Sequence, residues 1–204
     1  MSDPRTRLFV SLPAFVESGR AAACLRAFCA RADVACLLLR AGEDGVHDLE
    51  RARALVEAAQ ELDVAVVVEN DVAVARGSGA DGVHVTTGAG DAAAARQRLG
   101  DERIVGGECR ARRHEAMALG EAGVDYLALD QRQEAGGENL LDWAAQLLVI
   151  PLVAIHPAAA AQMATLAARG ADFVTPPEGI WSDEQSAARV AEACMNALRE
   201  GEGQ

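Results

Sequence analysis

The sequence predicts a single (β/α)8 barrel, the TIM-barrel fold, as one domain spanning residues 1–204. Short runs rich in leucine and β-branched residues alternate along the whole chain with alanine-rich amphipathic stretches. Each apolar run is continuous, which is typical of a parallel strand that is buried on both faces. The alternation repeats about eight times, the number of units that closes a barrel of this kind.

Each expected strand is followed by a stretch with helical periodicity. We expect strands at residues 7–12, 34–39, 64–68, 82–85, 103–106, 125–129, 150–155 and 172–175. We expect helices near 18–31, 47–61, 71–77, 90–98, 111–122, 138–148, 157–169 and 183–199, with a frayed tail at 201–204. The chief alternative is an open doubly wound sheet, which lacks support because no strand is followed by the G-x-G-x-x-G pattern.

A short Gly-x-Asp pattern recurs between an expected helix and the next strand. The glycine can take the left-handed conformation that ends a helix, and the aspartate can satisfy backbone donors at the turn. We therefore interpret these aspartates as structural residues at the bottom of the barrel. The pattern stands at residues 79–81, 123–125 and 170–172.

Composition excludes several classes of protein. A formal net charge of −12 repels a phosphate backbone, so we expect no nucleic-acid binding. No apolar run approaches the roughly 20 residues of a membrane span, and Pro13 and Glu17 interrupt the short apolar stretch that could resemble a secretory signal. The 5 cysteines are odd in number and lack metal-type spacing, which is typical of buried thiols in a cytoplasmic protein.

The chain contains no lysine, so every fixed side-chain cation is an arginine. Schiff-base chemistry, pyridoxal-phosphate anchoring and the phosphate-loop nucleotide fold all need a lysine amine and are excluded. Codon bias is the simpler origin of this composition, since the chain is also rich in alanine and arginine, but the chemical consequence holds for either origin.

In a (β/α)8 barrel, function gathers at the carboxyl ends of the strands. The residues expected there are polar, which suits a small polar ligand or a ligand that holds a divalent ion against carboxylates. They are Arg40, Glu69, Asn70, Asp71, His84, Thr86, Thr87, Glu108, Cys109, Asp130, Gln131, His156 and the segment 175–178.

Several of these residues also have a simpler interpretation. Asp71 can be a helix N-cap and His84 a satisfied core histidine. His156, which precedes a proline, can be an exposed loop residue. Arg40 follows the face of Cys36 and Leu38, so it either meets an anion in the barrel mouth or leans out to solvent. Cys109 can be a nucleophile or an inert thiol. The inert thiol is favoured, because no histidine is adjacent in the sequence to activate it.

The sequence resembles the thiamine phosphate synthase family and its sister branch, the thiazole tautomerases. The resemblance is carried by Asn70-Asp71, by the Gly-Ala-Asp-Gly-Val-His-Val run at 79–85, by Gly107, by Glu115-Ala116 and by the segment 122–126, and it recurs at 151–155. It covers most of the chain and is strongest from about residue 64 to 130. The Asn-Asp pair combined with Gly-Val-His is moderately specific, whereas the other matches are common to many barrels.

The resemblance implies an enzyme that joins an aminopyrimidine diphosphate to a thiazole phosphate and releases pyrophosphate with the assistance of Mg²⁺. In that case Arg40 would hold the diphosphate, Asn70 would orient the substrate and Asp71 would be a Mg²⁺ ligand. His84, Thr86, Glu108, Cys109, Asp130 and His156 are the further residues expected to bind the substrate.

The chain departs from the family pattern at several places. The glutamine and lysine that flank the family's strand-2 arginine are absent around Arg40, and the second metal aspartate is missing near 88–89, with Asp91 close by. The family's Gly-x-Ser-x-His falls on residues 107–111, where its serine and histidine are replaced. The threonine- and lysine-rich loop becomes residues 130–134, and the Gly-Gly that lets backbone amides approach a phosphate becomes His156-Pro157.

Two hypotheses follow. The first is a working synthase, or a related transferase, in which Arg132, Glu69 or Glu108 compensates for the lost groups. The second is a diverged paralogue, catalytic or not, whose acidic mouth binds a different small polar or cationic ligand. The helices with arginine and glutamate on their surfaces also allow a homodimer.

Overall fold

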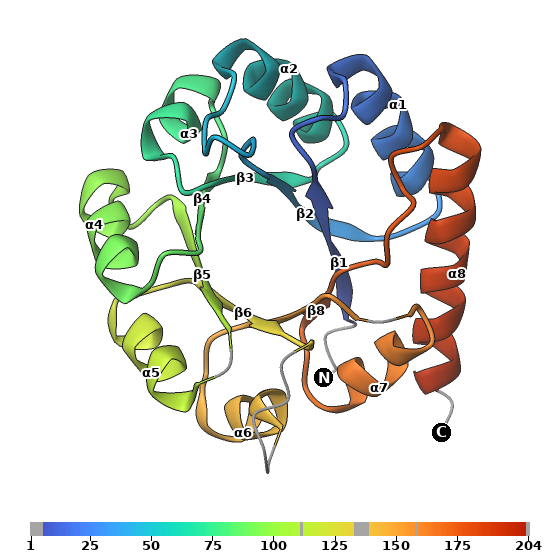
Figure 1. Ribbon diagram of the computed structural model, residues 1–204. Helices are drawn as coiled ribbons and strands as arrows, with labels where there is room; N and C mark the ends of the chain where they lie inside the picture. Colours follow the sequence, from blue (N-terminus) through green and yellow to red (C-terminus); the bar gives the residue numbers. More distant parts are fainter. Residues whose placement is uncertain (1–5, 111, 133–138, 158, 203–204) are drawn as a thin grey trace.

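The computed structural model describes residues 6–110, 112–132, 139–157 and 159–202. These residues form a closed barrel in which the strands follow one another in chain order and every neighbouring pair is parallel (Figure 1). The strands are β1 (Arg7–Leu12), β2 (Val34–Leu39), β3 (Ala65–Glu69), β4 (Gly82–Val85), β5 (Ile104–Cys109), β6 (Tyr126–Asp130), β7 (Leu152–Ile155) and β8 (Phe173–Val174). The predicted (β/α)8 architecture is confirmed.

A ring of helices covers the outside of the barrel (Figure 1). They are α1 (Ser18–Cys29), α2 (Leu49–Gln60), α3 (Val72–Ser78), α4 (Ala89–Leu99), α5 (Arg113–Glu121), α6 (Leu140–Leu147), α7 (Gln162–Ala168) and α8 (Glu184–Glu202). Helix α8 extends past its predicted end at 199, so residues 201–202 of the expected tail are helical, and 203–204 lie outside the described residues. Within the described part of the chain, no helix combines the length and apolarity needed to cross a bilayer.

The side chains of each strand alternate between two apolar layers, which explains the continuous hydrophobic runs. The larger layer lies between the strands and the helices and includes Leu37, Val66, Leu127 and many helix residues. The smaller layer fills the barrel interior and consists of Phe9, Cys36, Leu38, Val67, Tyr126, Ala128, Val153 and Ile155. Within each strand, the residues that follow these interior positions by two also point toward the barrel axis, and this alternation brings polar side chains to the carboxyl end.

The Gly-x-Asp turns have the structural role predicted for them. Gly79, Gly123 and Gly170 have φ angles of 81°, 78° and 97°, the left-handed region that favours glycine. Each following aspartate accepts the backbone N–H of a residue on the preceding strand, at 2.7 to 2.8 Å. The pairs are Asp81 with Val66, Asp125 with Val105, and Asp172 with Leu152. These contacts join neighbouring strands at the amino-terminal end of the barrel.

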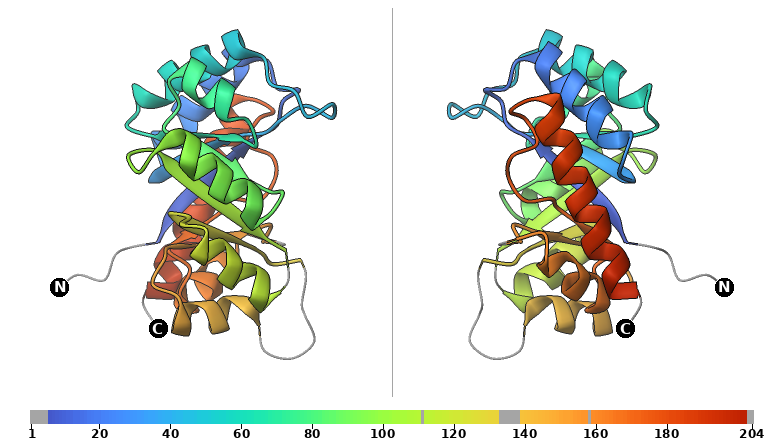
Figure 2. Two further views of the ribbon diagram at one scale, coloured as in Figure 1. Left: turned by 90° about the vertical axis from the view of Figure 1, so that its left-hand side faces the viewer. Right: turned by 90° about the vertical axis from the view of Figure 1, so that its right-hand side faces the viewer.

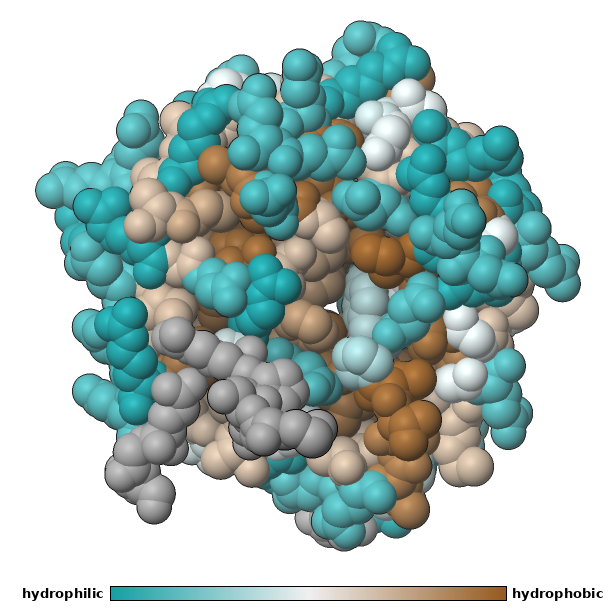
Figure 3. All heavy atoms as spheres, turned by 180° about the vertical axis from the view of Figure 1, so that it is seen from behind, coloured by the Kyte–Doolittle hydropathy of each residue, from teal (hydrophilic) through white to brown (hydrophobic). Residues whose placement is uncertain are grey.

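The two ends of the barrel differ in form. The loop that joins β2 to α2, residues 40–48, projects from the carboxyl-terminal end (Figure 2). The opposite end, in space-filling view, has hydrophilic side chains around its rim with hydrophobic patches between them (Figure 3). The carboxyl-terminal end, called the mouth below, is formed by the last residues of the strands and the loops that follow them.

Candidate functional site at the barrel mouth

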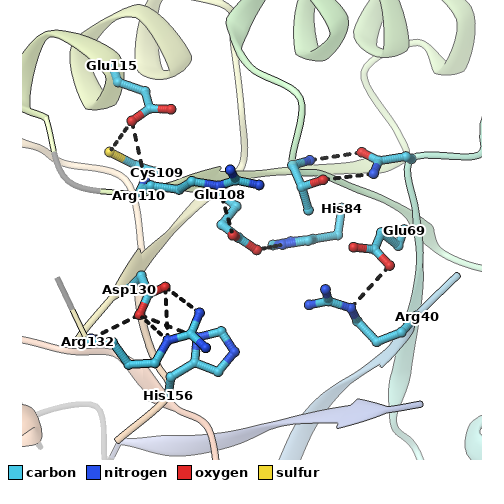
Figure 4. A network of polar contacts seen from close by, with 12 residues as sticks. Arg40, Glu69, His84, Glu108, Cys109, Arg110, Glu115, Asp130, Arg132 and His156 are labelled. Atoms are coloured by element: carbon cyan, nitrogen blue, oxygen red, sulfur yellow. Dashed lines mark hydrogen bonds and ion pairs between the residues drawn. The ribbon is translucent and has the colours of Figure 1, made fainter. Parts of the chain in front are cut away.

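Three carboxylates from β3, β5 and β6 face the mouth from inside the barrel (Figure 4). Glu69, Glu108 and Asp130 have exposed fractions of 7%, 8% and 6%. Glu69 and Asp130 lie two residues beyond the interior positions of Val67 and Ala128, and Glu108 lies two beyond Gly106, which faces the Tyr126 ring, so the same alternation turns all three inward. Buried carboxylates need partners. Each of the three has at least one basic side chain within ion-pair distance.

Arg40 points into the mouth, where Glu69 meets it. The guanidinium Nε lies 3.1 Å from Glu69 Oε2, and the Arg40 side chain stays 36% exposed. The same Glu69 oxygen accepts the N–H of Ala41 at 2.8 Å, and the Glu69 carbonyl lies 2.8 Å from His47 Nε2. Glu69 therefore fixes both Arg40 and the projecting loop, and Arg40 keeps nitrogen atoms available for an anion.

Asn70 lies just past β3 with a φ of 54°, a left-handed conformation that asparagine adopts more readily than most residues. Its Nδ2 donates to Thr86 Oγ1 at 2.8 Å, and the Thr86 N–H donates to Asn70 Oδ1 at 2.9 Å. The Asn70 N–H also donates to the carbonyl of His84 at 2.9 Å. Asn70 and Thr86, both expected at the site, are thus joined to each other across β3 and β4.

Asp71 caps helix α3, one of the two roles considered for it. Its Oδ1 accepts the N–H of Val74 at 2.9 Å. Within the described residues, no three histidine, cysteine, aspartate or glutamate side chains converge in a way that could hold a metal ion. The chain by itself offers Asp71 as a single carboxylate at this position, and Asp91 lies exposed in the first turn of α4.

His84 is buried inside the barrel between Glu108 and Tyr126. Its Nδ1 lies 2.8 Å from the Tyr126 hydroxyl, and its Nε2 makes a long contact of 3.5 Å to Glu108 Oε2. The imidazole stacks on the Tyr126 ring with the planes 16° apart. His84 is 1% exposed, so it is satisfied by side chains of the core and reaches the mouth only through Glu108.

A glycine makes room for this arrangement. A Cβ atom on Gly106 would lie 1.9 Å from Cζ of Tyr126, so only glycine fits under the ring. Phe9 completes the aromatic floor, with its ring 5.4 Å from that of Tyr126 in an edge-to-face arrangement.

The charge on Glu108 depends on its neighbours. Burial by itself would raise the pKa of Glu108. The hydrogen bond from His84 and its electrostatic attraction to the carboxylate, with smaller contributions from Arg40 and His156, outweigh burial and hold the pKa of Glu108 below its usual value. Glu108 is therefore ionised at neutral pH.

Asp130 lies at the end of β6, where Arg132 holds it. The guanidinium Nε and Nη2 of Arg132 lie 3.1 and 2.7 Å from the two carboxylate oxygens, and the Arg132 N–H donates to Oδ1 at 2.9 Å. Burial would raise the pKa of Asp130, but these Arg132 hydrogen bonds lower it below its ordinary value. This pairing puts Arg132 at the mouth. Residues 133–134 of the same loop lie outside the described residues.

His156 follows β7 with a φ of 58°, a left-handed conformation that is uncommon for residues other than glycine, although histidine adopts it more readily than most. Its N–H donates to the Thr175 hydroxyl at 3.1 Å. Its Nδ1 lies 3.4 Å from Asp130 Oδ1, an ion-pair distance, but it is a buried atom without a hydrogen-bond partner because the alignment is poor. The structure therefore places His156 at the mouth beside Asp130.

Cys109, like the buried His84, is an expected substrate-binding residue that the structure does not place at the mouth surface. It is fully buried in the outer layer, and its Sγ lies 3.5 Å from the Arg112 carbonyl and from Glu115 Oε2 of α5 (Figure 4). Neighbouring residues of a strand face opposite sides, so an inward Glu108 requires an outward Cys109. Cys109 belongs to the packing of α5 against β5, which corrects its expected place in the mouth.

Sequence reasoning missed Tyr126, Phe9 and His47. Tyr126 could have been found from strand alternation, because it lies four residues before Asp130 on the same face of β6. Phe9 and His47 carried no distinguishing signal, since one is an ordinary core aromatic and the other a loop residue.

Comparisons with known proteins agree with this geometry. A family model described as thiamine monophosphate synthase matches residues 9–180. A thiamine-phosphate synthase of Hyphomonas neptunium is 32% identical over 211 residues, covering 97% of this chain and 95% of the relative. A thiamine-phosphate synthase of Erythrobacter litoralis is 37% identical over 158 residues, covering 71% of this chain and 74% of the relative.

Solved structures agree in fold. The thiamine phosphate pyrophosphorylase of Pyrococcus furiosus superposes with a TM-score of 0.76 at 16% identity, covering 97% of this chain and 98% of the other. A 3-hexulose-6-phosphate synthase superposes with a TM-score of 0.71, also at 16% identity, covering 95% and 100% of the two chains. Because the family model spans most of the chain and full-length relatives exceed 30% identity, this protein belongs to the thiamine monophosphate synthase family.

Proposed function

We propose that this protein joins an aminopyrimidine diphosphate to a thiazole phosphate at the barrel mouth and releases pyrophosphate. The observation that carries the proposal is that Arg40, Asn70 and Glu108 all lie at the carboxyl ends of the strands, at one mouth, in a chain of this family. Relatives named thiamine-phosphate synthase that align with nearly the whole chain support the same reaction.

Each mouth residue has a physical role in such a transfer. The Arg40 guanidinium is the fixed cation that would neutralise charge on the departing diphosphate. Asn70, held by Thr86, would orient the substrate through the remaining hydrogen-bonding capacity of its amide. Leaving-group departure requires charge neutralisation, so loss of Arg40 should slow the chemical step rather than the folding of the barrel.

Mg²⁺ is compatible with the donors present. Such ions are commonly held by one or two carboxylates, with substrate phosphates and water completing the shell. Asp71 can supply one carboxylate while its Oδ1 caps α3, and the diphosphate would supply the other charged ligands. A bound Mg²⁺ would add charge neutralisation at the diphosphate oxygens.

The test is direct. The protein is incubated with Mg²⁺ and the two phosphorylated precursors, and thiamine phosphate is detected by its fluorescence after oxidation. We expect product above background with the wild type and little with Arg40→Ala. Absence of product at micromolar protein, while a known synthase reacts under the same conditions, would contradict the proposal.

A second candidate is a diverged protein that binds a different small cationic ligand. The observation that favours it is the set of three buried carboxylates at the mouth. One of them, Glu69, forms an ion pair with Arg40 and so neutralises part of its positive charge. Thermal-shift titration with thiamine, its phosphates and each precursor separates the two candidates, because a ligand that binds the folded state raises the melting temperature. Stabilisation by thiamine with no turnover of the precursors would favour the second candidate.

A further inference from the structure

We propose that Glu108 is a ligand-binding residue that accepts a hydrogen bond from an amino group on a planar heterocycle, and that His84 and Tyr126 orient its carboxylate. The inference rests on the proposed function for the choice of ligand, and its evidence is the geometry of β4, β5 and β6 inside the barrel.

The carboxylate of Glu108 is satisfied on one side only. Oε2 faces His84 Nε2 at 3.5 Å, and the charged partner nearest to Oε1 is Arg110 Nε at 4.0 Å, beyond hydrogen-bond distance. Among the described residues, the buried polar side-chain atoms without a hydrogen-bond partner are Arg51 Nε and His156 Nδ1. Glu108 Oε1 is not one of them, so this oxygen remains accessible from the mouth. An acceptor oxygen that is neither bonded within the protein nor buried is available to a donor group that enters the mouth.

The position of the His84 hydrogen follows from its two partners. An ionised carboxylate only accepts hydrogen bonds, so the contact to Glu108 requires a hydrogen on Nε2. In the neutral imidazole Nδ1 is then an acceptor, and the Tyr126 hydroxyl donates to it across 2.8 Å. Burial raises the pKa of Tyr126 well above its ordinary value, which keeps this hydroxyl protonated.

The surroundings of Glu108 suit a flat ring. Phe9 and Tyr126 form the aromatic floor beneath it, and Leu38 and Ile155 belong to the same interior cluster. An apolar floor with one inward carboxylate favours a planar heterocycle with an N–H donor over a phosphate group, because two anions repel. The phosphate end of a ligand would instead lie toward Arg40.

His84 is 1% exposed and the Tyr126 hydroxyl is bonded to His84 Nδ1, so both act on the amino group of a ligand only through Glu108 and are positioning residues for that carboxylate. Their effect is to hold the Glu108 side chain in one orientation and to keep its negative charge. Gly106 supports the same arrangement of Glu108, His84 and Tyr126, since a larger residue at position 106 would displace the Tyr126 ring.

The experiment measures binding of an aminopyrimidine alcohol that carries no phosphate, by calorimetry, to the full-length protein. We expect Glu108→Gln to weaken binding by roughly tenfold or more, because a charge-assisted hydrogen bond is lost. Glu115→Gln is the matched control, since Glu115 bonds to the outer side of β5, and it should bind like the wild type. Unchanged affinity in Glu108→Gln would overturn the proposal.

A second measurement does not depend on the folding of that variant. Nitrogen-15 NMR of histidine in the wild type should show His84 with its hydrogen on Nε2. Tyr126→Phe should shift the Nδ1 resonance and lower the affinity for the aminopyrimidine alcohol, by a smaller factor than Glu108→Gln does. A hydrogen on Nδ1 with a bare Nε2 would overturn the inference. If the synthase reaction alone failed, the binding and NMR measurements would still test the role of Glu108. If product formed but Glu108→Gln bound the aminopyrimidine alcohol like the wild type, the role of Glu108 would be rejected and the proposed function would stand.

Discussion

Asn70 and Thr86 bind each other through two reciprocal hydrogen bonds, of 2.8 and 2.9 Å, that join the carboxyl ends of β3 and β4. Asn70 can do so because its backbone is left-handed, with a φ of 54°. The Asn-Asp and Gly-Val-His-Val segments that carry the family resemblance are therefore connected physically, and the connection also positions the start of α3.

This pairing makes a prediction about stability. Asn70→Ala should lower the free energy of unfolding by about 1–3 kcal/mol, because it loses both hydrogen bonds and leaves a strained residue at positive φ. Asn70→Gly loses the same bonds but relieves the strain, so we expect it to be the more stable of the two. Urea unfolding measures the difference, and an alanine variant as stable as the glycine variant would contradict the argument.

The contact of Tyr126 with Gly106 predicts strong coupling between the two positions. Gly106→Ala should destabilise the protein by about 1–3 kcal/mol, since its Cβ would overlap the Tyr126 ring. In the Tyr126→Ala background, the same change should cost much less. A double-mutant cycle by urea unfolding measures the coupling, and additive effects would mean that the ring does not occupy this space.

Substitutions in the Gly-x-Asp turns should lower the stability of the protein without changing ligand binding. Asp172→Ala should cost about 1–3 kcal/mol because the N–H of Leu152 loses its side-chain acceptor, whereas Asp172→Asn keeps an acceptor oxygen and should cost less. Both variants should keep the thermal shift given by a ligand, since these turns lie at the opposite end from the mouth. A folded Asp172→Asn protein without that shift would contradict the assignment.

Asp130 predicts a pH dependence with a defined sign. Its pKa is lowered in the folded protein by the Arg132 hydrogen bonds, so its ionisation stabilises the fold above the ordinary value of 3.8. This stabilisation is lost as the pH falls through the lower pKa of the folded state. Urea unfolding at pH 5, 4 and 3 should therefore show a gap in stability between wild type and Asp130→Asn that shrinks as the pH falls.

The exposed Asp101 provides the control for this experiment, because Asp101→Asn should show little difference from the wild type at any of these pH values. A gap for Asp130→Asn that widened on acidification would have the wrong sign and would exclude the Arg132 pairing as its cause.

Much of the fold could be predicted from the sequence, because the elements that define it obey simple periodic rules. The eight strands are buried on both faces and are therefore continuous apolar runs, and the Gly-x-Asp turns carry their own chemistry. The start of α7 could not be predicted: it begins at Gln162 rather than near 157, and the left-handed conformation of His156 before it carries no signal in the sequence. Residue 158 lies outside the described residues.

The site was predictable in its location but not in its pairings. Strand ends identified Arg40, Glu108, Asp130 and His156 as mouth residues, and the structure brings them there. Asn70 lies there too, at the end of β3, bonded to Thr86. Which side chains contact one another depends on register between strands and on rotamers, which a single sequence does not contain. The position of Cys109 was wrong for a reason that the sequence did contain, the alternation of β5.

The proposed ligand lies in the mouth with its phosphates toward Arg40 and its ring over Phe9 and Tyr126. A crystal structure of the protein grown with the aminopyrimidine diphosphate and Mg²⁺ tests it most directly. We expect density at the carboxyl ends of the strands, with the diphosphate against Arg40 and the amino group against Glu108. Density for the ligand on another face of the barrel, or with its diphosphate at Glu108, would contradict it.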